Sequence, residues 1–304
     1  MKADAVTHLP GRRVEISYGL QGSGPPLLLL HGYPQTKRVW DKVAARLAEG
    51  FTVVTADLRG YGESSKPAGL PDHSTYSKRA MAQDQVELMR LLGFEHFAVA
   101  GHDRGGRVVH RMCLDHSDTV TMAVVLDILP TTEVYESVDR ELATAYFHWF
   151  FLEQANDLAE RLIDSNPDAW IDHVLGLTGG AGSIVLKDVE HYRSIFRDPA
   201  TVHATCEDYR AAATIDLDHD RADRGNLVAC PLLVLWGERG LLAQREDPLA
   251  VWRRHAKDVR GSQLPGGHFV VDDCPEAVAD QLANFLSGSP DTISPLTPPA
   301  DVGF

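Results

Sequence analysis

Short apolar runs alternate with stretches of helical period over the first 130 residues of the chain. Four of these runs are continuous, at residues 27–30, 51–57, 96–100 and 122–130. A continuous run is typical of a strand buried on both faces, as in a parallel sheet. Helical period separates the runs, at residues 39–47, 77–92 and 108–113, with Ser77 as a candidate N-cap. The pattern predicts an α/β fold with a mostly parallel central sheet flanked by helices.

The ends of the chain and its middle depart from this alternation. Residues 13–18 alternate between polar and apolar positions, which predicts an exposed edge strand. Residues 131–225 carry helical patterns and an aromatic run at 146–151, but few strand signals. Strand patterns resume at residues 231–237 and near 262–264, followed by a helical pattern at 275–286. We therefore expect one core made of residues 1–130 and 226–288, an inserted helical cap at 131–225, and a disordered tail rich in Pro and Ser at 289–304.

Composition narrows the class of protein. The formal net charge of −14 argues against a surface that follows nucleic-acid phosphates. No stretch has the length and apolarity of a membrane span, and the first residues do not resemble a signal peptide. The four cysteines lie without metal-ligand spacing, at Cys113, Cys206, Cys230 and Cys274. We expect a cytoplasmic protein with reduced thiols that binds neither nucleic acid nor membrane and needs no metal or cofactor.

The most informative stretch follows the third apolar run. Gly101-His102-Asp103-Arg104-Gly105 stands where a strand turns into a helix, and it resembles the nucleophile elbow of α/β-hydrolases with aspartate in place of serine. A carboxylate suits displacement at saturated carbon, where it forms an alkyl ester that a second step must hydrolyse. The alternative is an aspartate that only caps the helix, which is common in α/β proteins.

Two further residues complete a candidate catalytic set. Asp127 and His268 each come at or just after a predicted strand end, and the order nucleophile, acid, histidine is that of the α/β-hydrolase triad. His268 has no proton to take from an ionised Asp103, so its expected task is to activate water against the ester, with Asp127 orienting the ring. Glu238 is an alternative acid, because many relatives place the acid after the later strand.

The stretch His31-Gly32-Tyr33 ends the first buried run, as in the loop that supplies an oxyanion donor in α/β-hydrolases. The donors expected here are the backbone N–H groups of Tyr33 and of Arg104. Residues 14–287 as a whole resemble the fluoroacetate dehalogenases, the haloacetate dehalogenase branch of the α/β-hydrolases. The matching motifs are residues 31–36, 101–107, 126–131, 148–149 and 206–210.

The resemblance implies a function and a set of binding residues. The expected reaction converts a short 2-haloacid such as fluoroacetate or chloroacetate into glycolate and halide through an aspartyl ester. Arg104 and Arg107 are then expected to bind the substrate carboxylate, and His148, Trp149 and Tyr209 the halide. The resemblance also implies a homodimer and a small anionic substrate. Residues 37–38 and 147 depart from the family pattern, which leaves the choice between fluoride and chloride open.

The sequence leaves a rival reaction open. An epoxide hydrolase uses the same aspartate nucleophile and histidine, and His148 and Tyr209 could serve as its ring-opening donors. Arg104 and Arg107 argue against this alternative. They are three residues apart on one predicted helix face, where two guanidinium groups suit a carboxylate, whereas a neutral epoxide offers them nothing to bind. A binding protein without activity would not need Asp103, Asp127 and His268 together.

Overall fold

The computed structural model describes residues 3–11, 14–179 and 186–288. Its strands are β1 (Ala3–His8), β2 (Glu15–Gly22), β3 (Pro26–Leu30), β4 (Thr52–Ala56), β5 (Phe97–His102), β6 (Val120–Leu126), β7 (Leu232–Gly237) and β8 (Val259–Leu264). The helices of the core are the short η1 (Lys37–Trp40) and η2 (Ser74–Tyr76), then α1 (Asp41–Leu47), α2 (Lys78–Leu91), α3 (Arg104–Asp115), α12 (Leu241–Arg245), α13 (Pro248–Trp252), α14 (Val270–Asp273) and α15 (Pro275–Leu286).

The strands form one sheet of eight in the order β1-β2-β4-β3-β5-β6-β7-β8. β1 and β2 pair antiparallel, as do β2 and β4, whereas every pair from β4 to β8 is parallel. Because these strands run parallel, their carboxyl ends meet at one edge of the sheet, which is where such folds bind ligands. β5, which leads to Asp103, lies near the middle of this sheet.

The sheet is buried on both faces, as the continuous apolar runs predict. In β3, Leu27 and Leu29 belong to one apolar core, together with side chains of α1 and α15. Leu28 and Leu30 belong to the other core, with side chains of α2, α3 and the inserted helices. Ser77 accepts a hydrogen bond from the backbone of Ala80, which confirms it as the N-cap of α2. This layering places β5 between the two apolar cores and packs α3 into one of them.

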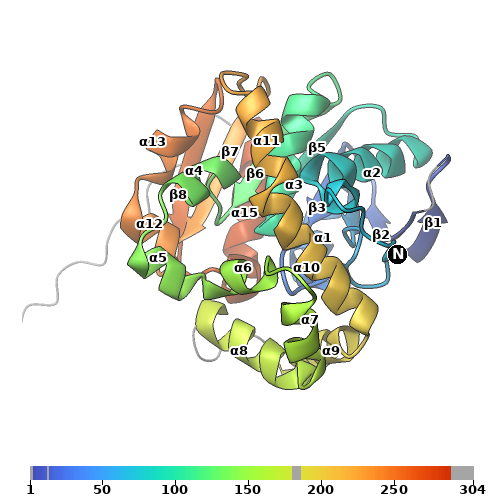
Figure 1. Cartoon of the computed structure of the whole chain (residues 1–304). Helices are drawn as coiled ribbons and strands as arrows, with labels where there is room; N and C mark the ends of the chain where they lie inside the picture. The colour runs from blue at the N-terminus through green and yellow to red at the C-terminus, as the bar shows by residue number, and fades with distance from the viewer. Residues whose placement is uncertain (1–2, 12–13, 180–185, 289–304) are drawn as a thin grey trace, which may run out of the picture.

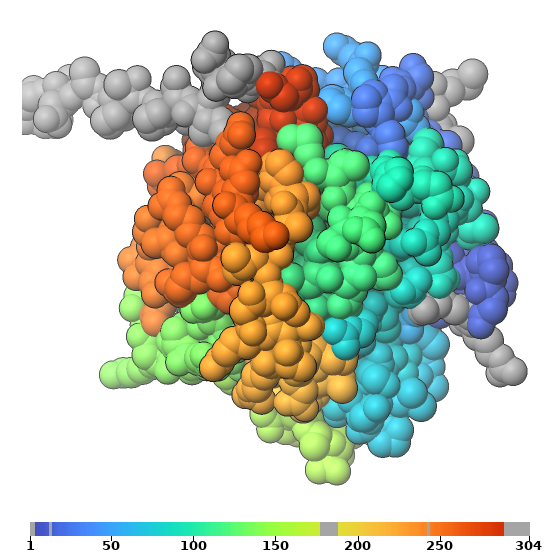
Figure 2. Space-filling view, turned by 90° about the horizontal axis from the view of Figure 1, so that it is seen from above, coloured from blue at the N-terminus to red at the C-terminus, as the bar shows by residue number. Residues whose placement is uncertain are grey.

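The described residues between β6 and β7 contain helices and no strand. The helices are α4 (Thr131–Glu136), α5 (Arg140–Ala145), α6 (Phe147–Leu152), α7 (Leu158–Asp164), α8 (Pro167–Gly179), α9 (Leu186–Phe196), α10 (Pro199–Ala213) and α11 (Ile215–Ala222). Figure 1 shows α6 to α9 gathered on one side of the sheet, with α10 and α11 running back toward the core. From above, the yellow-orange segment that ends this insertion lies between the orange C-terminal part of the core and the green segment next to it (Figure 2).

Two predictions at the ends of the chain have different outcomes. Residues 13–18 do not form an edge strand: β2 lies between β1 and β4, and β1 takes the edge position. The sequence pattern predicts no strand at Ala3–His8, and it is this strand that pairs with β2 and covers its edge. The predicted disordered tail at 289–304 lies outside the described residues. Among the described helices, none combines the length and the apolarity that crossing a membrane requires.

Candidate active site

Asp103 stands at the sharp turn between β5 and α3. Its φ is +47° and its ψ is −117°, a conformation that non-glycine residues rarely adopt. The turn depends on its glycines: a Cβ at Gly101 would lie 2.5 Å from the backbone of Gly105, and one at Gly105 would lie 2.5 Å from the carbonyl oxygens of Leu30 and His31. The predicted elbow is therefore present, and it presents the Asp103 side chain at the end of the strand.

The loop after β3 holds one oxygen of this carboxylate. The backbone N–H of Tyr33 donates a hydrogen bond of 2.9 Å to Oδ1 of Asp103. This is the donor that the sequence predicts for the oxyanion site. The matching role of the Arg104 backbone N–H stays a prediction.

Asp127 and His268 meet beside Asp103. Nδ1 of His268 lies 2.6 Å from Oδ2 of Asp127, and the backbone N–H of Gly237 donates to Oδ1 of Asp127 at 3.1 Å. The other ring nitrogen of His268, Nε2, lies 3.7 Å from Oδ2 of Asp103. The alternative acid, Glu238, is half exposed and pairs with Arg239 at 3.0 Å. Asp127 is therefore the carboxylate that contacts His268.

The protonation states of this set follow from burial and charge. Burial raises the pKa of Asp103, but the positive fields of His268 and of the two neighbouring guanidinium groups outweigh it and bring the pKa to about 2. Burial lowers the pKa of His268, but the hydrogen bond and charge of Asp127 outweigh it, so the net shift is upward from 6.5. Asp103 is thus an anion at neutral pH, and Asp127 makes His268 a stronger base.

Arg104 pairs with an acidic side chain and is not among the residues that line the cavity around Asp103. Its guanidinium is fully buried and pairs with Asp208, through Nε at 2.9 Å and Nη2 at 2.6 Å. The carboxylate of Asp208 is also bonded by Lys78 and accepts a hydrogen bond from the Tyr61 hydroxyl at 2.6 Å. Nη1 of Arg104 is buried without a hydrogen-bond partner among the described residues. The sequence did not predict the Asp208 pairing, although Asp208 lies within the 206–210 motif.

Arg107 is arranged differently. Its Nη1 donates to the carbonyl oxygen of Leu129 at 3.0 Å and to the Thr131 hydroxyl at 3.1 Å, and both acceptors are uncharged. It forms no ion pair with any carboxylate of the described residues, and its Nε is buried without a partner. The guanidinium lies 4.6 Å from the ring centre of Trp149. A buried cation of this kind is costly unless an anion joins it.

The three predicted halide-binding residues lie together. The ring centres of His148 and Tyr209 are 5.9 Å apart, and those of Trp149 and Tyr209 are 6.2 Å apart. Burial lowers the pKa of His148 to about 3, so its ring is neutral. The Tyr209 ring also lies under Arg104, 4.2 Å from the guanidinium carbon. All three side chains carry N–H or O–H donors that are not hydrogen-bonded to other described residues.

A small cavity joins most of these groups. It is lined by Asp103, Arg107, Asp127, Tyr146, His148, Trp149 and His268. The structure thus gathers six predicted residues around one space, whereas Arg104 and Tyr209 do not line it; Tyr209 packs against two of the lining rings, those of His148 and Trp149. Tyr146 was not singled out from the sequence. It belongs to the 146–151 aromatic run, two residues before His148, but the run alone does not separate a ring that lines a cavity from one that fills a core.

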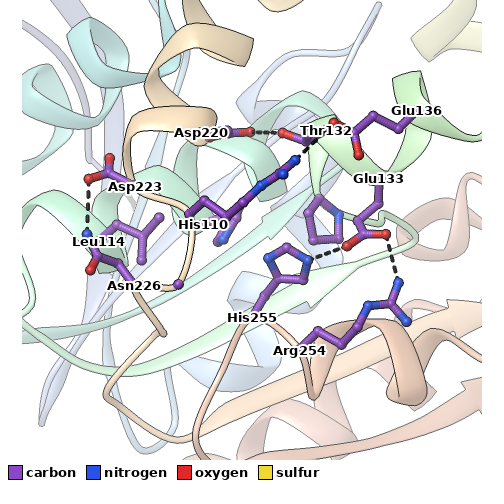
Figure 3. A pocket seen from close by; sticks show the side chains of 13 residues that line it. His110, Leu114, Thr132, Glu133, Glu136, Asp220, Asp223, Asn226, Arg254 and His255 are labelled. Carbon is purple, nitrogen blue, oxygen red and sulfur yellow. Dashed lines mark hydrogen bonds and ion pairs between the residues drawn. The ribbon is translucent and has the colours of Figure 1, made fainter.

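A larger cavity of about 510 Å³ shares no lining residue with this site (Figure 3). It lies where the chain enters and leaves the inserted helices. Its acidic groups are already engaged: Glu133 pairs with Arg254 and His255, each at 2.7 Å, and Asp220 accepts a hydrogen bond from Thr132. It contains none of the predicted catalytic residues, so the candidate active site is the smaller cavity at Asp103.

The parallel sheet, the aspartate elbow and the Asp127–His268 pair define the class of protein. A family profile described as the α/β hydrolase fold matches residues 25–276. The chain belongs to the α/β-hydrolase family, which confirms the predicted fold class.

Within that family, three similarities are informative. The chain is 50% identical to a fluoroacetate dehalogenase from Burkholderia sp over 277 residues, 90% of this chain and 91% of the relative. It is 30% identical to a soluble epoxide hydrolase from Corynebacterium sp. (strain C12), over 89% of this chain and 93% of the relative. A crystal structure from Nostoc sp PCC 7120, assigned to the α/β hydrolases, superposes with a TM-score of 0.92 at 49% identity and covers 94% of this chain and 98% of that one. The expected resemblance to fluoroacetate dehalogenases is confirmed.

The difference in pKa between His268 and His148 can be measured without a substrate. In ¹⁵N-labelled protein, the His268 imidazole is expected to titrate above pH 6.5, whereas His148 stays neutral down to about pH 3. Asp127→Asn removes the charge that raises the His268 pKa, so that pKa should fall. A His268→Gln variant assigns the resonance. A His268 pKa that is the same in the wild type and in Asp127→Asn contradicts the pairing.

Proposed function

We propose that this enzyme hydrolyses short 2-haloacids such as fluoroacetate or chloroacetate to glycolate and halide through an ester on Asp103. The observation that carries the proposal is Arg107, a buried guanidinium without an acidic partner among the described residues, on the wall of the cavity that contains Asp103. A neutral substrate would leave that charge unpaired. A small carboxylate would pair with it and bring its own α-carbon beside the nucleophile.

In the first step, an Asp103 carboxylate oxygen attacks the α-carbon of the haloacid. The new C–O bond forms as the C–halogen bond breaks, and the halide leaves with the bonding electrons. Oδ2 is the oxygen left for attack, because Oδ1 accepts the hydrogen bond from Tyr33. His148, Trp149 and Tyr209 donate to the departing halide, where negative charge develops only as the bond breaks.

In the second step, Nε2 of His268 takes a proton from water, and the hydroxide attacks the carbonyl carbon of the Asp103 ester. The N–H of Tyr33 stabilises the oxyanion that forms there, and Asp127 stabilises the charged imidazole at 2.6 Å. Collapse of this intermediate expels the glycolate oxygen, which receives the proton from His268. Asp103 is left with one oxygen derived from water, and its carboxyl group releases the second proton of that water to solvent, which restores the carboxylate.

In carboxylate binding, the two arginines have different roles. Arg107 supplies the unpaired charge, and its position on the cavity wall supports this role. Arg104 supplies Nη1, the nitrogen that Asp208 does not use. The charge of Arg104 is balanced by Asp208, so Arg104 adds a directed hydrogen bond rather than net charge.

An epoxide hydrolase is the second candidate. It is supported by the Corynebacterium relative and by the neighbouring donors of His148 and Tyr209. The same Asp103 and His268 would serve it, with ring opening in place of halide loss. Arg107 separates the two candidates, since an epoxide carries no anion. Halide release from fluoroacetate and chloroacetate, compared with the turnover of a small epoxide, decides between them.

The covalent route is tested by trapping its intermediate. In His268→Ala, alkylation of Asp103 remains possible, but the ester cannot be hydrolysed, so the intact mass should rise by one carboxymethyl group after incubation with chloroacetate. In wild-type enzyme in excess over substrate, a single turnover in ¹⁸O water should place the label in Asp103 and not in glycolate. Label found directly in the first glycolate would falsify the covalent route.

Removal of the unpaired charge tests carboxylate binding. Arg107→Met should lower kcat/KM for chloroacetate by about ten- to a hundredfold or more, because a charge-assisted contact of about 1.5–3 kcal/mol is lost. Chloroacetamide, which is neutral and nearly the same size, serves as the control substrate. It should react poorly with the wild type, and Arg107→Met should change its rate far less. Equal losses for the acid and the amide, or equal wild-type rates, would exclude the carboxylate contact.

The halide site is tested by the difference between two leaving groups. Trp149→Phe keeps most of the ring and deletes one N–H donor. The single-turnover alkylation rate should fall by a factor corresponding to more than about 1 kcal/mol for fluoroacetate and clearly less for chloroacetate, because fluoride needs more stabilisation as it leaves. Thermal unfolding checks that the fold is intact. The same factor for both substrates would make Trp149 a packing residue only.

A further inference from the structure

Tyr146 lines the candidate active site but has no part in the reaction described above. The other six lining residues supply the nucleophile, the water-activating pair, the carboxylate contact and two halide donors. Tyr146 immediately precedes α6, and only 8% of its surface is exposed. Its hydroxyl makes no hydrogen bond to another described residue. A large side chain at this position, without a polar partner, occupies space beside the reacting groups.

The contacts of Tyr146 hold its ring in place. The ring stacks on Trp149 with 5.6 Å between ring centres and an angle of 18° between planes. It also lies 5.9 Å from the His148 ring, nearly edge-on. Burial and the charges of Asp127 and Asp103 raise the pKa of its hydroxyl, so the ring stays uncharged. Tyr146 therefore forms a rigid, neutral wall next to the nucleophile and its histidine.

The space that this wall encloses is very small. Its volume is about 10 Å³, compared with about 510 Å³ for the cavity of Figure 3. Even a haloacetate requires some outward movement of the lining. A bulkier acid requires more, and it must displace rings that are stacked on one another.

The geometry of the displacement reaction determines where a substituent on the α-carbon of the haloacid would lie. Attack at saturated carbon places the nucleophile oxygen, the α-carbon and the halogen nearly in line. With the carboxylate held by Arg107, the two α-hydrogens lie on opposite sides of the plane that contains this line and the carboxylate carbon. A substituent in place of one hydrogen must enter one of those two sides, and one ring can block only one of them.

We infer that Tyr146 is a specificity-determining residue that excludes one enantiomer of 2-haloacids substituted at the α-carbon, by occupying the space that a methyl group on one face of that carbon would need. This inference rests on the proposed function. It predicts the size and the stereochemistry of the excluded substrates, which the reaction alone does not.

The test compares chloroacetate with each enantiomer of 2-chloropropionate. In Tyr146→Ala, the kcat/KM ratio of 2-chloropropionate to chloroacetate should rise at least about tenfold for one enantiomer, because room for one methyl group is worth about 10- to 200-fold in such pockets. The gain for the other enantiomer should be much smaller. Tyr146→Phe keeps the ring and should leave both ratios near the wild-type values.

Tyr135 provides a matched control. Its ring also packs against Trp149, with 5.4 Å between ring centres, but it does not line the cavity. Tyr135→Ala loosens the same tryptophan without removing the wall, so both ratios should stay unchanged. Thermal unfolding of all three variants accounts for any loss of folded enzyme, and the ratios are independent of the active fraction.

Several results would overturn the inference. They are a wild type that turns over both 2-chloropropionate enantiomers as well as chloroacetate, an unchanged ratio in Tyr146→Ala, an equal gain for both enantiomers, and a similar gain in Tyr135→Ala. Failure of the proposed function has a different signature, since the wild type would then release no halide from chloroacetate or fluoroacetate. A wild type that is active on haloacetates, with unchanged ratios in Tyr146→Ala, rejects the role of Tyr146 alone.

Discussion

The close approach of the β5–α3 turn to the end of β3 is the constraint on which the site depends. Asp103 adopts a positive φ of 47°, a strain of about 1–3 kcal/mol that the surrounding packing must hold. Gly101 and Gly105 make that packing possible, because a Cβ at either position would lie 2.5 Å from backbone atoms. The same approach brings the Tyr33 N–H to Asp103, and it sets the direction in which Arg104 and Arg107 leave the first turns of α3.

Charge is distributed around this turn in a way that favours a small anion. The chain as a whole is acidic, with a net charge of −14, and its nucleophile is an anion as well. Asp208 pairs with both Arg104 and Lys78, and a second carboxylate, Asp216, lies 3.7 Å from Lys78, so the two cations face two anions and this cluster adds no net positive charge to the site. Among the described residues, Arg107 bonds to uncharged oxygens and forms no ion pair. In the proposed reaction, this cation offsets the repulsion that an incoming carboxylate meets from Asp103.

The sequence predicted what depends on local pattern and chain order. Continuous apolar runs identified the strands from β3 to β7, and the order of Asp103, Asp127 and His268 placed them at one edge of the sheet. The features that the sequence did not predict depend on contacts between segments that are far apart in the chain. The spacing of Arg104 and Arg107 predicts a shared helix face. Arg104 instead pairs with Asp208 of α10, more than 100 residues later in the chain, where α10 packs on the core. The 146–151 run gives no sign of which aromatic ring lines a cavity and which fills a core, because both environments favour the same residue types.

In the proposed reaction, the movement of negative charge favours neutral donors at the halide end of the cavity. Before reaction, the site would hold the Asp103 carboxylate, the substrate carboxylate and the Arg107 cation. Formation of the ester removes the charge of Asp103 and places one on the leaving halide, while Arg107 stays paired with the carboxylate. A cationic group at the halide end would hold the product after the bond has broken. His148, whose pKa of about 3 keeps its ring neutral, can instead donate a hydrogen bond from its ring N–H without carrying a full charge. The stabilisation then grows with the charge that develops on the halogen, and release of the halide remains possible.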